Sequence, residues 1–182
     1  MIKIADSESE FEKIHRLNYK TFVDEIPQHE GNENSSLVDR FHWENTYIIA
    51  LDGERLIGMM AVRGNRPFSL DDKIQDLENY LPAGRRVCEI RLLAIEKEFR
   101  GGPVLFRMMK KMAQYCMKEG YDYAIISGTT RQQKLYHRLG FEPFYPKVGK
   151  NGAYYIPMRA SLEDFERKLG KLLSDQGNGK IF

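Results

Sequence analysis

A long apolar strand that runs through a glycine turn into an amphipathic helix constrains the fold more than any other feature. The strand reads RVCEIRLLAI (residues 86–95), and its second half is apolar on both sides, as in a central strand of a sheet. The helix is expected from Pro103 to Lys118, with apolar residues at helical spacing, and Gly120 ends it. A strand and a helix joined in this way predict a sheet with helices packed on it.

Local patterns predict the other elements. Two β-prone runs flank Asp52-Gly53, a dipeptide that favours a hairpin turn. The remaining expected elements are a first strand at 2–5, a helix after Ser7, a polar loop at 24–46, a short helix between Ser69 and Pro82, a strand at 121–127, a short helix ending at Gly140, two strands joined around Asn151-Gly152, and a last helix capped by Ser161. This order predicts the α/β (α+β) class in a single domain over residues 1–173, followed by a flexible tail at 174–182.

Charge and composition argue against several classes of function. The net charge of +2 gives no indication of nucleic-acid binding. No apolar run approaches the roughly 20 residues that a membrane helix needs, and the first ten residues contain no apolar signal region. Cys88 and Cys116 lack metal-ligand spacing, as do the four histidines. We therefore expect reduced thiols, no bound metal and a cytoplasmic protein.

The turn at residues 96–103 has two readings. Free backbone N–H groups at the start of the helix, with the partial positive charge of its dipole, can bind a phosphate that Gly101 and Gly102 allow to approach. Arg100 would add a cation, and a pyrophosphate would fit such a site. Any strand-to-helix turn can, however, use glycine followed by proline at the first helical position. This stretch alone leaves both readings open.

A second motif, KLYHRLGF (residues 134–141), lies one helix and one strand downstream. On its own it indicates a packed tyrosine on a short helix. Together with the turn, it resembles the GCN5-related N-acetyltransferase superfamily of acyl-CoA-dependent N-acyltransferases. LLAIEKEFRGG (residues 92–102) resembles the central strand and pyrophosphate loop of that superfamily, and LYHRLGF resembles its Leu-Tyr-x-x-x-Gly-Phe motif. The resemblance is strongest over residues 86–145.

The resemblance implies a mixed, mostly antiparallel, twisted sheet of about seven strands, flanked by helices and splayed between the fourth and fifth strands. Acetyl-CoA or another acyl-CoA would bind in the splay as co-substrate. The residues implied in binding it are Leu93, Ala94, Ile95, Arg100, Gly101, Gly102, Val104, Leu105 and Thr130. The chain departs from the usual loop at Pro103 and Leu105, where small residues are expected, and Pro103 also lacks an N–H donor. Thr129 stands where the superfamily often has asparagine.

The resemblance also implies a direct attack of an amine on the thioester. Tyr136 matches the tyrosine that often protonates the leaving thiolate, and a backbone N–H near Leu93 would hold the oxyanion. Glu89 is the candidate general base, with a salt bridge to Arg91 or Arg86 as the structural alternative. Arg91 is the candidate ligand for a substrate carboxylate, or a strand arginine whose head reaches solvent.

Three functions stay open on the sequence. The first is an acyl-CoA-dependent N-acyltransferase, most simply an acetyltransferase, that acts on a small-molecule amine or amino acid. The second follows from a fainter similarity to the branch that makes N-acyl homoserine lactones and long-chain N-acyl amino acids from acyl carrier protein, although Asn18 stands where that branch often has arginine. The third is a non-catalytic acyl-CoA-binding module, which the departures in the loop would suit. A homodimer is an open alternative to a monomer.

Overall fold

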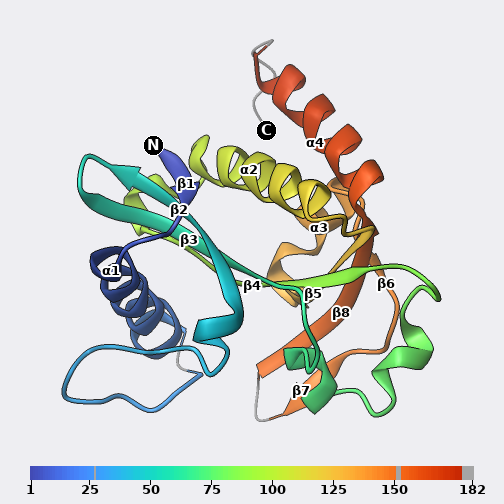
Figure 1. Cartoon of the computed structure of the whole chain (residues 1–182), viewed down its shortest axis with the longest axis horizontal. Coiled ribbons are helices and arrows are strands. Elements are labelled where there is room, and N and C mark those ends of the chain that lie inside the picture. The colour runs from blue at the N-terminus through green and yellow to red at the C-terminus, as the bar shows by residue number, and fades with distance from the viewer. Residues whose placement is uncertain (27, 151–152, 178–182) are drawn as a thin grey trace. The chain divides into compact units, whose positions relative to one another are not determined.

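The computed structural model describes residues 1–26, 28–150 and 153–177. It contains one sheet, four α-helices and several short helices (Figure 1). The strands are β1 (Ile2–Ile4), β2 (Asn45–Asp52), β3 (Arg55–Arg63), β4 (Val87–Ile95), β5 (Tyr123–Thr129), β6 (Glu142–Pro143), β7 (Val148–Lys150) and β8 (Ala153–Ser161). The α-helices are α1 (Glu8–Tyr19), α2 (Val104–Lys118), α3 (Gln133–Arg138) and α4 (Leu162–Gly177). The strand order is β1-β2-β3-β4-β5-β8-β6, and β7 pairs with β8.

The chain divides into two compact units, and each is built from separate segments. Unit 1 comprises residues 1–63 and 90–111, and unit 2 comprises residues 64–89 and 112–182. Strand β4 and helix α2 each contribute residues to both units. The predicted single domain over residues 1–173 stays a prediction.

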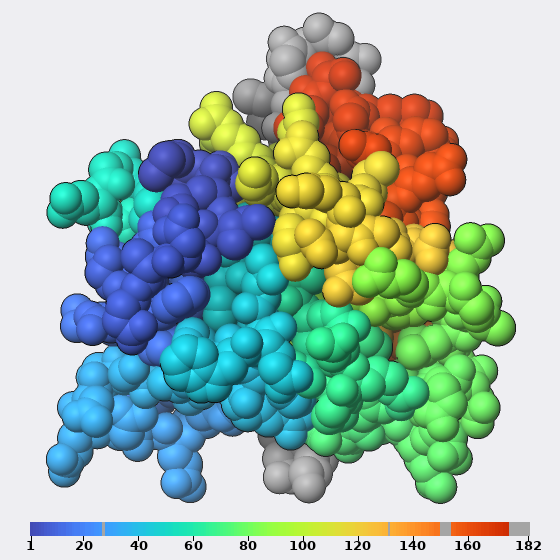
Figure 2. Space-filling model, viewed as in Figure 1, coloured from blue at the N-terminus to red at the C-terminus, as the bar shows by residue number. Residues whose placement is uncertain are grey.

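Unit 1 is built on the hairpin of β2 and β3. Gly53 has a φ of 58° in the turn, the left-handed conformation for which the Asp52-Gly53 pair was expected. Helix α1 lies along this hairpin (Figure 1) and buries Ile14 and Leu17 against it. In Figure 2, α1 and the segment that leads to β2 are exposed on the face toward the viewer, in dark to light blue. The apolar face of one helix and one face of the hairpin therefore supply the core of unit 1.

Unit 2 is built on β5 and β8, which pair antiparallel from Tyr123↔Ser161 to Thr129↔Tyr155. The start of β4 pairs parallel with β5 over three positions only, from Val87↔Tyr123 to Glu89↔Ile125. A ladder that stops so early agrees with the predicted splay between these strands. The core of this unit gathers Phe68, Leu70, Ile74, Leu77, Ile125 and Val148.

The sequence predicted the mixed, mostly antiparallel sheet and its flanking helices correctly, with eight strands where about seven were expected. The segment between Ser69 and Pro82 forms two short 3₁₀ helices, η3 (Ser69–Asp72) and η4 (Leu77–Tyr80), because Asp76 takes a left-handed conformation between them. Helix α2 begins at Val104 and not at Pro103, whose carbonyl accepts the Arg107 N–H.

The C-terminal helix also differs from its prediction. Ser161 caps α4 as expected, since its Oγ accepts the Asp164 N–H at 3.2 Å. The helix then continues to Gly177, so residues 174–177 are helical, and the flexibility predicted for the tail at 174–182 stays a prediction. The expected turn at Asn151-Gly152 and the rest of the tail lie outside the described residues.

Candidate active site

The end of β4 and the turn after it form the predicted donor loop, residues 95–105, in unit 1. Ala94 and Ile95 are buried, and Leu93 is half-buried. Gly101 has a φ of 78°, and a Cβ placed there would meet no heavy atom within 4 Å. The turn therefore needs glycine for its conformation, and it leaves open space beside the backbone. Val104 and Leu105, both half-buried, start α2 directly after this turn.

Arg100 is not a free cation at this loop. Its Nε donates to the Ile95 carbonyl at 2.7 Å, and one NH2 group lies 2.5 Å from the Glu25 Oε2. Glu25 ends the π-helix η1 (Lys20–Glu25) that follows α1. Arg100 as a phosphate ligand stays a prediction, and any phosphate would meet a guanidinium that already has an acidic partner.

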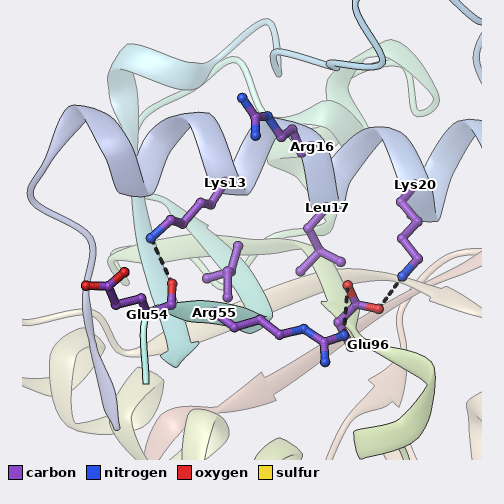
Figure 3. A pocket seen from close by; sticks show the side chains of 8 residues that line it. Lys13, Arg16, Leu17, Lys20, Glu54, Arg55 and Glu96 are labelled. Carbon is purple, nitrogen blue, oxygen red and sulfur yellow. Dashed lines mark hydrogen bonds and ion pairs between the residues drawn. The ribbon is translucent and has the colours of Figure 1, made fainter. Parts of the chain in front are cut away.

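A second acidic residue, Glu96, follows β4 in the same loop. Its carboxylate is buried and lies 2.5 Å from the Lys20 Nζ and 3.8 Å from an Arg55 nitrogen. Figure 3 shows these groups along one side of a groove of about 310 Å³, with Leu17 facing into it and Arg16 turned away. Arg55 also pairs with Glu98 at 2.6 Å. Ion pairs therefore connect η1, the β2–β3 hairpin and the donor loop.

The backbone of β4 is irregular just before Leu93. Leu92 has a φ of 53°, which is uncommon for a leucine and costs on the order of 1–3 kcal/mol. Such a conformation persists only where the surrounding packing holds it, and it is often found at functional sites. It interrupts the strand next to the backbone N–H that was predicted to hold the oxyanion, a role that stays a prediction.

Arg91 belongs to a charged cluster that also contains Asp39, Phe41, Glu44 and Arg63, called the Asp39 cluster below. The Arg91 NH1 donates to the Asp39 Oδ2 at 2.7 Å, and both side chains are largely buried. The guanidinium groups of Arg63 and Arg91 lie 3.7 and 4.9 Å from the centroid of the Phe41 ring. Arg63 pairs with Glu44 at 3.1 Å. The Arg40 guanidinium lies 4.4 Å from the same centroid, so three cations surround one aromatic ring, and Arg63 and Arg91 pair with carboxylates.

Hydrogen bonds continue from this cluster into a polar chain. The Asp39 Oδ2 also accepts from the Asn45 Nδ2 at 2.8 Å, and the same amide nitrogen lies 3.2 Å from the Tyr47 hydroxyl. That hydroxyl lies 3.2 Å from the His42 Nδ1. Burial raises the pKa of Tyr47 to about 12, so its phenol is neutral at physiological pH.

Tyr136 lies on α3 in unit 2, as predicted. Its ring packs beside β5, where a Cβ on Gly128 would come within 3.2 Å of the Tyr136 Cδ2. Burial raises the pKa of its phenol, while hydrogen bonds from the side chain and backbone of Thr129 favour the ionised form. Thr129 therefore contacts the phenol oxygen from the position where the superfamily often has asparagine. Thr130, the next residue, is exposed at the start of η6 (Thr130–Gln132).

Glu89 also lies in unit 2 and is 1% exposed. Its carboxylate accepts the Ser69 N–H at 2.7 Å, the Ser69 hydroxyl at 2.6 Å and the Leu70 N–H at 3.2 Å. These bonds hold the start of η3 against β4, so Glu89 has a clear structural role. Its role as general base stays a prediction.

The predicted site residues thus fall into two groups. Leu93–Ile95, the donor loop and Arg91 lie in unit 1, and Glu89, Thr130 and Tyr136 lie in unit 2. Sequence reasoning missed Glu25, Asp39 and Arg63. In the sequence, Glu25 and Asp39 are charged residues in a polar segment without hydrophobic periodicity, and Arg63 ends an apolar strand. Neither feature indicates a site.

Two further properties of the described residues bear on the kind of site. Within residues 1–26, 28–150 and 153–177, no three His, Cys, Asp or Glu side chains are grouped as a metal site would require. The same residues contain no helix long and apolar enough to cross a bilayer. Cys88 and Cys116 are buried free thiols whose Sγ atoms are 3.7 Å apart.

Known structures share this fold at low sequence identity. A CoA-dependent acyl-homoserine lactone synthase, BjaI, solved with SAM and isopentyl-CoA, superposes with a TM-score of 0.80 at 17% identity, over 94% of this chain and 89% of that one. FeeM, an N-acyl amino acid synthase from uncultured soil microbes, gives 0.71 at 16%, over 92% and 93%. Escherichia coli ElaA gives 0.63 at 17%, over 88% and 100%.

Sequence comparison is more specific. A search of curated protein sequences found no match. The family model for the N-acyl amino acid synthase FeeM, in contrast, matches residues 13–159, which include the second half of α1, the donor loop and the Tyr136 motif. The match covers most of the chain and agrees with the resemblance that the two motifs carried. The chain therefore belongs to the N-acyl amino acid synthase FeeM family.

Proposed function

We propose that this protein is an N-acyltransferase that moves an acyl group from a thioester to the primary amine of an amino acid. Its family supports acyl transfer to nitrogen as the class of reaction. The observation that carries the proposal is the Tyr136 phenol, half-buried on the helix of the second motif and hydrogen-bonded by Thr129. A protein that only bound thioesters would have no need of a proton donor held in this way.

In the proposed reaction the neutral amine attacks the thioester carbonyl directly. The new C–N bond forms as a tetrahedral intermediate, whose oxyanion a backbone N–H near Leu93 would stabilise. The C–S bond then breaks, and Tyr136 donates its proton to the thiolate. The two Thr129 donors would stabilise the resulting phenolate until it regains a proton from the ammonium. Glu89 is the candidate to accept, directly or through water, the earlier proton that the substrate ammonium must lose before its neutral amine can attack.

The Asp39 cluster supports an amino acid as the acceptor. Arg91 suits a substrate carboxylate that displaces Asp39 from it, whereas Arg63 is 1% exposed and pairs with Glu44. The acidic groups of the cluster suit an ammonium before it loses a proton. An α-amine with a pKa near 8 is about one-tenth neutral at pH 7, whereas a lysine side chain near 10.4 is less than about one-thousandth neutral. The reaction of an α-amino group therefore depends less on deprotonation by a general base than the reaction of a protein lysine would.

The donor has two candidates. Acetyl-CoA or another acyl-CoA suits the open turn at Gly101, and BjaI was solved with isopentyl-CoA. A long-chain acyl group on an acyl carrier protein is favoured by one observation, the Arg100–Glu25 ion pair, because it reduces the positive charge available to a pyrophosphate. Location in the cytoplasm, a homodimer and a non-catalytic acyl-CoA-binding module remain secondary proposals.

A panel of thioesters tests the donor. Acyl-CoA from C2 to C14 and the same acyl groups on a carrier protein are compared by the shift that each produces in Tm. We expect long chains to raise Tm by several degrees more than acetyl-CoA, because a longer chain buries more apolar surface on binding. Equal shifts in Tm for all chain lengths would rule out the long-chain donor and would favour an acetyltransferase.

A further inference from the structure

Three cations at the donor loop have charges that are already matched by carboxylates. Arg100 pairs with Glu25, Lys20 with Glu96, and Arg55 with Glu98. The pairing distances are 2.5, 2.5 and 2.6 Å. A site that attracts a diphosphate normally presents uncompensated positive charge. Here three carboxylates lie beside the loop where that charge is needed.

Glu25 differs from the other two carboxylates in its partner. Arg100 comes directly before the glycine turn, and its Nε is fixed on the Ile95 carbonyl at 2.7 Å, so its position is set by the loop itself. The Glu25 carboxylate occupies the outer side of this guanidinium, where a phosphate oxygen would bind. A phosphate must therefore either displace Glu25 or bind next to its negative charge.

The segment that carries Glu25 is itself unusual. Lys20 begins the π-helix η1 and Glu25 ends it, and both residues form ion pairs with residues of the donor loop. π-Helical turns are rare and are found often at functional sites. The Arg100–Glu25 pair is exposed, and such a pair contributes little to stability on average. The Lys20–Glu96 pair is partly buried. Together the two pairs attach both ends of the π-helix to the donor loop.

We propose that Glu25 is a specificity-determining residue that disfavours thioester donors with a diphosphate. It keeps Arg100 from the diphosphate of CoA and so favours donors in which a pantetheine arm ends in a single phosphodiester, as on a carrier protein. This inference rests on the proposed function, because it concerns the donor of that reaction. It adds to that function a residue outside both sequence motifs.

The test compares two ligands that share the pantetheine arm. Kd values for CoA and for pantetheine are measured by calorimetry on the wild type and on Glu25→Gln, and KM values are measured with octanoyl-CoA and octanoyl-pantetheine. Glutamine keeps the shape of Glu25 without its charge. We expect the variant to bind CoA roughly five- to tenfold more tightly, which is about the size of one Coulomb interaction at 4 Å in water, while pantetheine changes by less than about twofold. Rising ionic strength should shrink the CoA effect.

Two further variants control for indirect effects. Asp24→Asn removes a neighbouring exposed carboxylate of the same π-helix and should leave both ligands unchanged. Glu25→Gln combined with Arg100→Gln should lose the gain in CoA binding. Unchanged CoA binding in Glu25→Gln, or an equal change for CoA and pantetheine, would overturn the proposal. Absence of turnover with every thioester would count against the proposed function alone, because the calorimetric comparison does not require catalysis.

Discussion

Replacing Tyr136 with phenylalanine is expected to lower kcat about 100-fold and to leave KM and Tm close to their wild-type values. General acid catalysis contributes about 10²–10⁴-fold, and a thiolate is a good enough leaving group to place the effect near the lower end. Burial raises the pKa of the phenol above its ordinary value, so the phenol is protonated at neutral pH. Any alkaline decline in the wild-type kcat that comes from this group should therefore lie at a higher pH than the titration of a free tyrosine.

Two controls separate proton donation from packing. Tyr154→Phe removes the hydroxyl of an exposed tyrosine in the same unit and should leave kcat unchanged. Thr129→Val removes one donor to the phenol oxygen and should lower kcat less than Tyr136→Phe does. A Tyr136→Phe enzyme that keeps more than about half of the wild-type kcat would show that another group protonates the thiolate.

The largest expected effect on stability comes from Glu89→Ala. The substitution leaves two buried backbone N–H groups and one hydroxyl without the carboxylate that accepts from them. Loss of a buried, hydrogen-bonded charge typically lowers the free energy of unfolding by about 3–5 kcal/mol. For a chain of this length the Tm should fall on the order of 10 °C. Thermal unfolding followed by circular dichroism measures both quantities.

Companion variants show whether Glu89 is also a base. Ser69→Ala removes one donor and should lower stability by about 1–2 kcal/mol with no change in kcat at 15 °C. Glu89→Gln keeps the size of the side chain. A fall in its kcat at a temperature where it remains folded would support the base, and an unchanged kcat would leave Glu89 with its structural role only.

The sequence predicted the features that depend on neighbouring residues. Asp52-Gly53 forms the hairpin turn, Ser161 caps α4, and Gly140 ends the short helix of the Tyr136 motif with a φ of 91°. In each case a conformation or a cap is decided within a few residues, so the local pattern is enough. The single helix predicted after Ser69 was wrong, because Asp76 takes a left-handed conformation that interrupts it. Aspartate alone is not a strong enough sequence signal to predict that conformation.

Only some residues of the candidate site could be predicted from the sequence. Tyr136 and the donor loop lie within motifs, whereas Asp39 pairs with Arg91 at a separation of 52 residues and Glu25 pairs with Arg100 at 75. Both acidic residues lie in or next to the polar segment at 24–46, which has no hydrophobic period. Their roles arise from tertiary contacts, so no pattern along the chain could identify them.

The central claim is that this protein forms an amide from a thioester and an amino acid. Its most direct test is mass spectrometry of the products after incubation with a decanoyl thioester and a mixture of amino acids, with released thiol measured in parallel. We expect one N-decanoyl amino acid per thiol released, and about 100-fold slower formation of both in Tyr136→Phe. Thiol release that does not depend on the amine, or no amide from any donor that binds, would contradict it.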